Sequence, residues 1–173
     1  MIPLSSANSS GFSWSKLPRS VGFEVKLNGR VVGALRRMSF SSSNYEATTS
    51  EGTFKIQRRG WSGTKDEIVD SVSQQQIAHF ESGWRRRSTL TFADGQRFQI
   101  ERNGCWRPRW SITSESGERI VSVDPRQRTA DTPVAIRVKN SRLVLLLMFI
   151  LYRIRQAEED ASAVAAVAAI AAS

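Results

Sequence analysis

The chain has 173 residues, 40% of them hydrophobic and 24% charged, a composition typical of one globular domain with a sizeable core. Its 25 Lys and Arg residues against 16 Asp and Glu give a net charge of +9, so we expect its surface to attract polyanions. The lone Cys105 and the lone His79 exclude an internal disulfide and a zinc site built from such residues.

Residues 1–19 are predicted to be a disordered lead-in. They are rich in Ser and Asn and have neither the basic segment nor the apolar run of a signal peptide. The first predicted strand is Val21–Asn28, in which apolar and polar residues alternate. The dipeptide Asn28-Gly29 then favours a two-residue hairpin turn, with Arg30–Phe40 as the returning strand.

Alternating residues between turn signals predict a long series of further strands. They are expected at 45–49, 53–59, 65–70, 76–81, 88–93, 96–102, 106–113, 118–123 and 134–139, with a polar loop at 124–132. Such regular spacing, with about twelve strands and no earlier helix, indicates an antiparallel sandwich or barrel.

An apolar run near the C-terminus, Leu143–Tyr152, contains no charge and no polar face. As a helix it would span roughly 15 Å, half of a bilayer core, so a buried core helix is favoured over a membrane anchor or a partner-binding segment. A closed barrel of about twelve strands needs such a filler. The sequence therefore predicts a mainly β fold: one closed antiparallel barrel at residues 20–156 enclosing a hydrophobic C-terminal helix at 142–156. For the Ala-rich tail at 157–173, a helix and a low-complexity disordered end both remain open.

Catalytic chemistry has few candidate residues. His79 lies in a predicted strand, and although a pair with Cys105 is conceivable, structural roles are favoured for both. The sequence contains no phosphate-binding glycine loop, and Glu158, Glu159 and Asp160 lack the spacing of a calcium loop. We therefore predict no enzymatic activity, no catalytic residue, no metal and no cofactor.

Basic residues gather beside tryptophans in or near three predicted loops. Guanidinium groups bind phosphate with two parallel hydrogen bonds, and tryptophan favours membrane interfaces. These clusters are the candidate lipid- or polyanion-binding residues: Trp84, Arg85, Arg86 and Arg87; Arg58, Arg59 and Lys65; Arg107 and Arg109. The alternative is that the charges only solvate the surface.

Four segments together resemble the tubby-like barrel superfamily, in its LURP-one-related and phospholipid-scramblase-like branches. They are the hairpin at Asn28-Gly29, the strand TFKIQRRG, the hairpin TLTFADGQRFQI and the apolar segment RLVLLLMFILYRIR. The resemblance covers residues 20–156 and implies a barrel of about twelve strands around a hydrophobic C-terminal helix. The Ala-rich tail departs from the plant LURP-one-type ending.

Tubby proteins bind phosphoinositides through basic surface residues, and scramblase-like members associate with membranes. The resemblance thus implies a non-enzymatic cytoplasmic module, peripheral at a membrane, that binds anionic phospholipid headgroups through arginine-rich loops. No individual lipid-binding position of the tubby proteins is matched, and the calcium site of the scramblase-like members is not found. Nucleic-acid binding by the same basic surface and a protein-interaction scaffold remain as alternatives.

Overall fold

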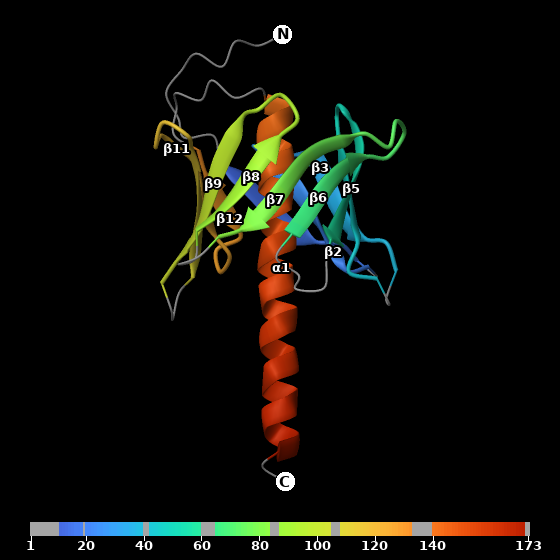
Figure 1. The fold of residues 1–173 in the computed structure, drawn as a ribbon, viewed down its shortest axis with the longest axis vertical. Helices are drawn as coiled ribbons and strands as arrows, with labels where there is room; N and C mark the ends of the chain where they lie inside the picture. Colours follow the sequence, from blue (N-terminus) through green and yellow to red (C-terminus); the bar gives the residue numbers. More distant parts are fainter. Residues whose placement is uncertain are drawn as a thin grey trace.

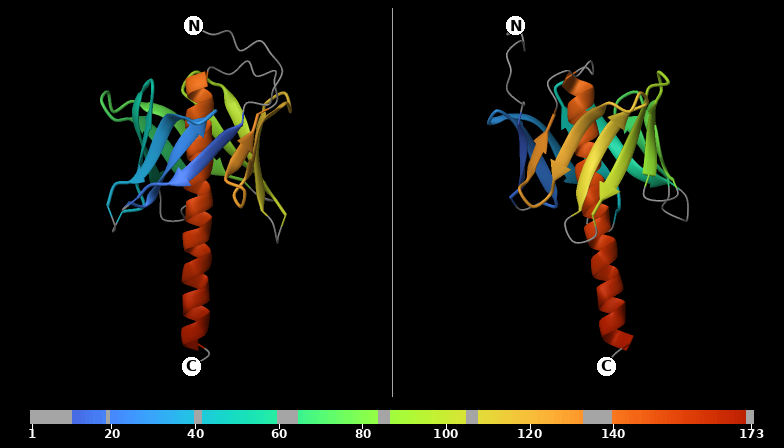
Figure 2. Two further views of the ribbon diagram at one scale, coloured as in Figure 1. Left: turned by 180° about the vertical axis from the view of Figure 1, so that it is seen from behind. Right: turned by 90° about the vertical axis from the view of Figure 1, so that its left-hand side faces the viewer.

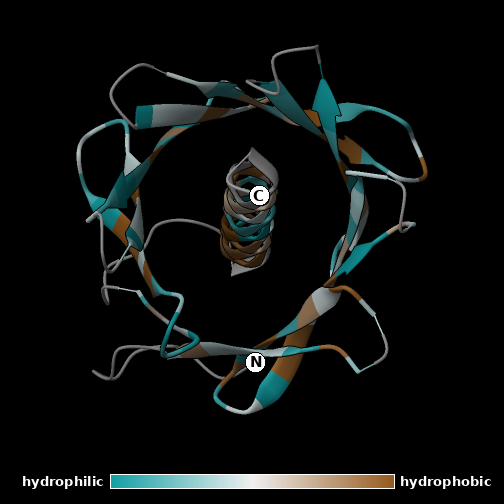
Figure 3. Ribbon diagram, turned by 90° about the horizontal axis from the view of Figure 1, so that it is seen from below, coloured by the Kyte–Doolittle hydropathy of each residue, from teal (hydrophilic) through white to brown (hydrophobic). Residues whose placement is uncertain are grey.

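A computed structural model describes residues 11–18, 20–39, 42–59, 65–83, 87–104, 108–132 and 140–171. Within these ranges, twelve strands form one closed antiparallel barrel and one helix runs through it (Figure 1). Seen along the helix axis, the strands surround the helix as a ring (Figure 3). The predicted fold class, a mainly β closed barrel around a hydrophobic C-terminal helix, is confirmed.

The strands follow one another around the barrel in chain order, and β1 closes it by pairing with β12. The elements are β1 Phe12–Lys16, β2 Gly22–Leu27, β3 Arg30–Arg37, β4 Tyr45–Thr49, β5 Gly52–Arg59, β6 Lys65–Asp70, β7 Gln76–Ser82, β8 Arg87–Phe92, β9 Arg97–Asn103, β10 Arg109–Ser114, β11 Arg119–Asp124, β12 Thr129–Asp131 and α1 Asn140–Ala171. At the predicted turn between β2 and β3, Asn28 and Gly29 have φ of 50° and 79°, the left-handed values that such a tight turn requires.

The N-terminal boundary of the barrel differs from the prediction. Residues 1–19 were expected to be disordered, which is wrong for Phe12–Lys16, because these residues form β1 and pair with both β2 and β12. Phe12 and Trp14 are only 3% and 7% exposed. Two apolar residues among serines are too short a pattern to indicate a strand, and pairing on both sides is what stabilises this one.

The C-terminal boundary of the barrel differs as well. The polar loop predicted at 124–132 contains β12, a strand of 3 residues in which Ala130 is fully buried. The strand predicted at 134–139 lies outside the described residues. Closure of the barrel at β1 and β12 thus uses two short strands whose own sequences carry little strand signal.

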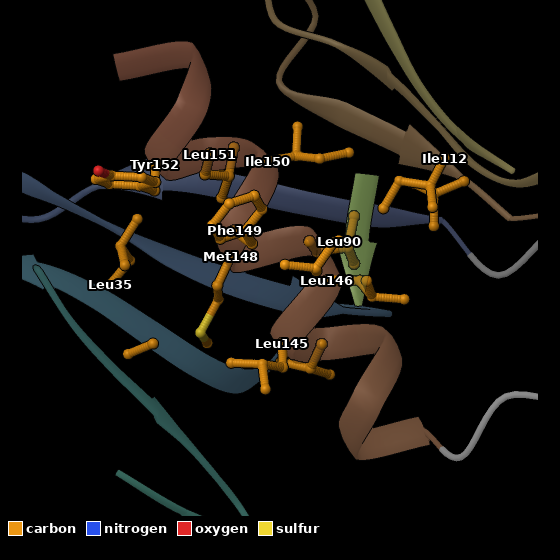
Figure 4. Packing of buried hydrophobic residues seen from close by; sticks show 14 of the residues in the cluster. Leu35, Leu90, Ile112, Leu145, Leu146, Met148, Phe149, Ile150, Leu151 and Tyr152 are labelled. Atoms are coloured by element: carbon orange, nitrogen blue, oxygen red, sulfur yellow. The ribbon is translucent and has the colours of Figure 1, made fainter. Parts of the chain in front are cut away.

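The barrel interior is filled by α1. Every residue of Leu143–Tyr152 is buried, and Figure 4 shows Leu146 and Phe149 among strand side chains that include Leu35, Leu90 and Ile112. The ring of Phe149 lies 5.1 Å, centroid to centroid, from that of Phe80 on β7. A helix buried on every side explains why this run has no polar face.

Gly33 of β3 lies close against the helix. A Cβ at this position would lie 2.8 Å from the carbonyl oxygen of Thr48 and would collide with the side chain of Met148. The glycine therefore makes room for the helix.

Beyond the barrel, α1 continues as a helix to Ala171, and both views of Figure 2 show it extending freely past the ring of strands. Of the two states left open for the Ala-rich tail, the structure thus shows the helix, as far as Ala171. Val164 and Val167 are 70% and 67% exposed there. Within the described part of the chain, no helix is both long enough and apolar enough to cross a bilayer.

We predict that Leu146→Asp prevents the barrel from folding. Leu146 is fully buried, and an unpaired carboxylate there would lower the free energy of unfolding by at least about 4 kcal/mol, close to the whole stability of a small domain. The matched control is Val167→Asp on the exposed part of the same helix, which should leave the thermal midpoint unchanged. Circular dichroism melting measures both, and a cooperative transition of unchanged midpoint for Leu146→Asp would contradict the prediction.

Candidate functional site

The loops of the barrel divide between two rims. Because neighbouring strands are antiparallel, each loop from an odd-numbered strand to the next even-numbered one lies at the same end. At this end α1 leaves the barrel, since Tyr152 contacts Asp66 at the start of β6 and Glu159 pairs with Arg37 at the end of β3. We call the ends of the odd strands and the starts of the even strands, at this end, the exit rim.

The predicted binding residues that the structure describes all lie on the exit rim. They come from three hairpins that are separate in sequence: Arg58 and Arg59 end β5, Lys65 begins β6, Arg87 begins β8 and Arg109 begins β10. The structure thus brings these five side chains to one rim, spread along it rather than gathered in one pocket. Trp84, Arg85, Arg86 and Arg107 lie outside the described residues.

Each of these basic side chains has a carboxylate partner, which the sequence analysis missed. The ion-pair distances are 2.7 Å for Arg59–Glu67, 3.4 Å for Lys65–Glu81, 3.0 Å for Arg87–Glu101 and 3.8 Å for Arg109–Asp124, and the cations of these pairs are 63–72% exposed. The Glu81 carboxylate is also exposed, so its pair with Lys65 contributes only about 0–1 kcal/mol, whereas Glu67, Glu101 and Asp124 are 14–27% exposed. Lys65 and Glu81, and Arg87 and Glu101, face each other across strand pairs, which only the register reveals.

Arg58 differs because it belongs to a buried polar cluster around Asp66. The Asp66 side chain is fully buried; its carboxylate accepts hydrogen bonds from the Tyr152 hydroxyl at 2.9 Å and from Arg153 Nη1 at 2.8 Å. Arg58 Nε lies 3.9 Å away. Arg153 also stacks on Phe80, 4.5 Å from the ring centroid. This cluster links β5, β6 and β7 to the helix where its apolar run ends.

Burial sets the ionisation of this cluster. It raises the pKa of the Asp66 carboxyl, against the opposing effects of Arg153 and the Tyr152 hydroxyl. Burial, together with the charge of Asp66, also raises the pKa of Tyr152 well above its ordinary value. The one sequence sign of this cluster is that Asp66 shares the inward face of its strand with Ile68.

His79 is exposed on β7, and Cys105 lies outside the described residues. Across the described ranges, no three His, Cys, Asp or Glu side chains are grouped so as to hold a metal ion.

Comparison of the chain with protein-family models, curated proteins and solved structures finds no match. The resemblance to the tubby-like superfamily therefore stays a prediction. The barrel and its central helix are established by the structure of this chain alone, and function has to be argued from its own residues.

We predict that Asp66→Asn changes how stability depends on pH. Because the pKa of Asp66 is higher in the folded state than in the unfolded state, its protonation favours folding, and this contribution is lost as the pH rises through the folded pKa. Asparagine does not titrate. Wild type should therefore gain stability relative to Asp66→Asn as the pH falls from 7 to 4.

Urea unfolding of the two proteins across this pH range measures the effect, and the difference between them removes the titration of the other carboxylates. The prediction is contradicted if the difference in the free energy of unfolding between the two proteins stays constant, or changes in the opposite direction, as the pH falls. Either result would show that the ion pair with Arg153 offsets or outweighs the effect of burial on Asp66.

Proposed function

We propose that this chain is a non-enzymatic module that binds membrane surfaces containing anionic phospholipid, with the exit rim against the membrane. The observation that supports this most directly is the position of basic side chains from three separate hairpins on that single rim. These hairpins are separate in sequence, and it is the antiparallel order of the closed barrel that brings their basic side chains to the same end.

The energetics of the exit rim suit a charged surface. The side chains of Arg59, Lys65, Arg87 and Arg109 are 63–72% exposed, so each can contact an anionic surface from the rim. Each basic residue near an anionic membrane contributes about 1 kcal/mol. Several such contacts, made together by a rigid rim, are enough for reversible membrane association.

The shape of this end favours a membrane over a nucleic acid. The helix projects beyond the exit rim, and its segment Ala161–Val167 carries no charge. A helix segment of Ala, Val and a single Ser can place apolar side chains against a lipid surface, whereas beside a nucleic acid it would offer no charge to the phosphate backbone. This segment therefore fits a lipid surface better than DNA or RNA.

We predict that the triple variant Arg59→Gln/Arg87→Gln/Arg109→Gln partitions about tenfold more weakly than wild type onto vesicles of phosphatidylcholine and phosphatidylserine. Each lost charge removes about 1 kcal/mol of attraction to the membrane, but the carboxylate partner of each arginine already cancels part of that attraction in wild type. Co-sedimentation at low salt measures this, and added salt should weaken wild-type binding.

The matched control is Arg30→Gln/Arg97→Gln/Arg119→Gln. These three exposed arginines begin β3, β9 and β11 at the opposite rim, so the control removes the same charge from the other end. It should bind as wild type does. Equal loss of binding in both variants would mean that net charge, and not the position of the charges, determines binding. The proposal would be overturned if wild type did not sediment with the vesicles, or if it bound duplex DNA more tightly than vesicles.

A further inference from the structure

A cleft of about 720 Å³ opens at the exit rim between α1 and the barrel wall. Its helix side is formed by Arg153, Gln156, Ala157, Asp160, Ala161 and Val164. These positions repeat at intervals of three and four residues, so they form a single face of the helix. Across from them, the barrel side includes Ile100 and Arg102 of β9 and Trp110 of β10.

The inner part of the cleft holds buried donors without acceptors. Gln156 is only 4% exposed, and its Nε2 has no hydrogen-bond partner within the described ranges. Arg153 Nε, one helical turn away, is also buried and has no acceptor in the part of the chain that the structure describes, although Nη1 of the same group is paired with Asp66. A buried donor left without an acceptor costs about 1–3 kcal/mol, so a ligand that supplies acceptor oxygens here would remove that cost.

Arg102 adds a cation on the opposite wall. Its guanidinium carbon lies 5.9 Å from the centroid of the Trp110 ring, and it forms no ion pair within the described part of the chain. This distinguishes Arg102 from Arg59, Arg87 and Arg109, each of which has a carboxylate. An anion in the cleft would therefore meet donors from the helix and from the barrel.

The outer part of the cleft is mainly apolar. Ala157, Ala161 and Val164 continue outward along the helix face, and Val164 is 70% exposed. Asp160 lies on the same face and would repel an anion at that level. The charged group of a ligand is thus directed inward to Gln156, and its body outward along the alanines.

We propose that this cleft binds an amphipathic organic anion. Its carboxylate or phosphate oxygens accept hydrogen bonds from Gln156 Nε2 and Arg153 Nε and pair with Arg102, and its apolar body lies along Ala157, Ala161 and Val164. The chemistry is the same for a free acid and for the headgroup of a membrane lipid. The cleft lining includes none of Arg59, Lys65, Arg87 and Arg109, so variants of these four residues and variants of the cleft test the two proposals separately.

The test uses the full chain and decanoate, below its micelle concentration, in isothermal titration calorimetry. Decanol, which lacks the anion, and butyrate, which lacks the long body, should each bind at least about tenfold more weakly than decanoate. Gln156→Leu should weaken decanoate binding about tenfold while leaving the thermal midpoint unchanged or higher, because it removes an unsatisfied buried amide. Asp160→Asn, on the same helix face, should strengthen binding.

The variants also separate the two possible sources of the ligand. If decanoate does not bind but Gln156→Leu weakens sedimentation with acidic vesicles, the cleft takes a lipid headgroup in its bilayer. The proposal for the cleft would be overturned if decanol bound as tightly as decanoate. It would also be overturned if the Gln156→Leu variant folded and bound both decanoate and vesicles as wild type does. Failure of the rim proposal looks different: the variant Arg59→Gln/Arg87→Gln/Arg109→Gln would then sediment like wild type.

Discussion

The structure depends on filling the inside of a wide barrel. Twelve strands enclose more volume than their own inward side chains occupy, and an empty interior of that size would not be stable. The helix supplies the missing side chains, and Leu143–Tyr152 is buried on all sides. Wall and helix therefore form one core, as the close fit of Gly33 against Met148 illustrates. A barrel without this helix would expose its inner face, and the helix alone would expose an apolar run.

The end of the apolar run determines where polar chemistry is located. Up to this point the helix makes apolar contacts, but Tyr152 and Arg153 donate hydrogen bonds to the buried carboxylate of Asp66. These hydrogen bonds hold the helix against β6. After this point Ile154 still packs in the core and Gln156 is buried, whereas Ala161–Val167 are exposed. The same helix rotation that places Arg153 on Asp66 turns Gln156 into the cleft, one turn later. The packing of the core thus sets the geometry of the candidate site.

The sequence predicted the parts of the fold whose signals are local. Asn28-Gly29 indicates its own turn, and the run from Leu143 to Tyr152 indicates its own burial. β1 and β12 were missed because closure, rather than composition, stabilises them. The candidate site was harder to predict. The partners of the rim arginines depend on strand register, as with Arg87 and Glu101, and the cleft depends on the rotation of a helix within a barrel, which no local pattern reveals.

Two kinds of hydrogen-bond donor lie at this end, and the proposed binding of anions gives them different roles. The rim arginines already have carboxylates, so they can exchange partners with any anionic surface and offer attraction without much selectivity. Among the residues that the structure describes, Gln156 Nε2 has no acceptor and Arg102 has no carboxylate partner. An amide that is buried and unsatisfied discriminates strongly between ligands that supply an acceptor and ligands that do not. Attraction at the rim and selection in the cleft are separable physical properties. A net charge of +9 predicts the attraction of an anionic surface to the rim. Selection in the cleft, in contrast, follows only from the way a single helix face meets β9 and β10.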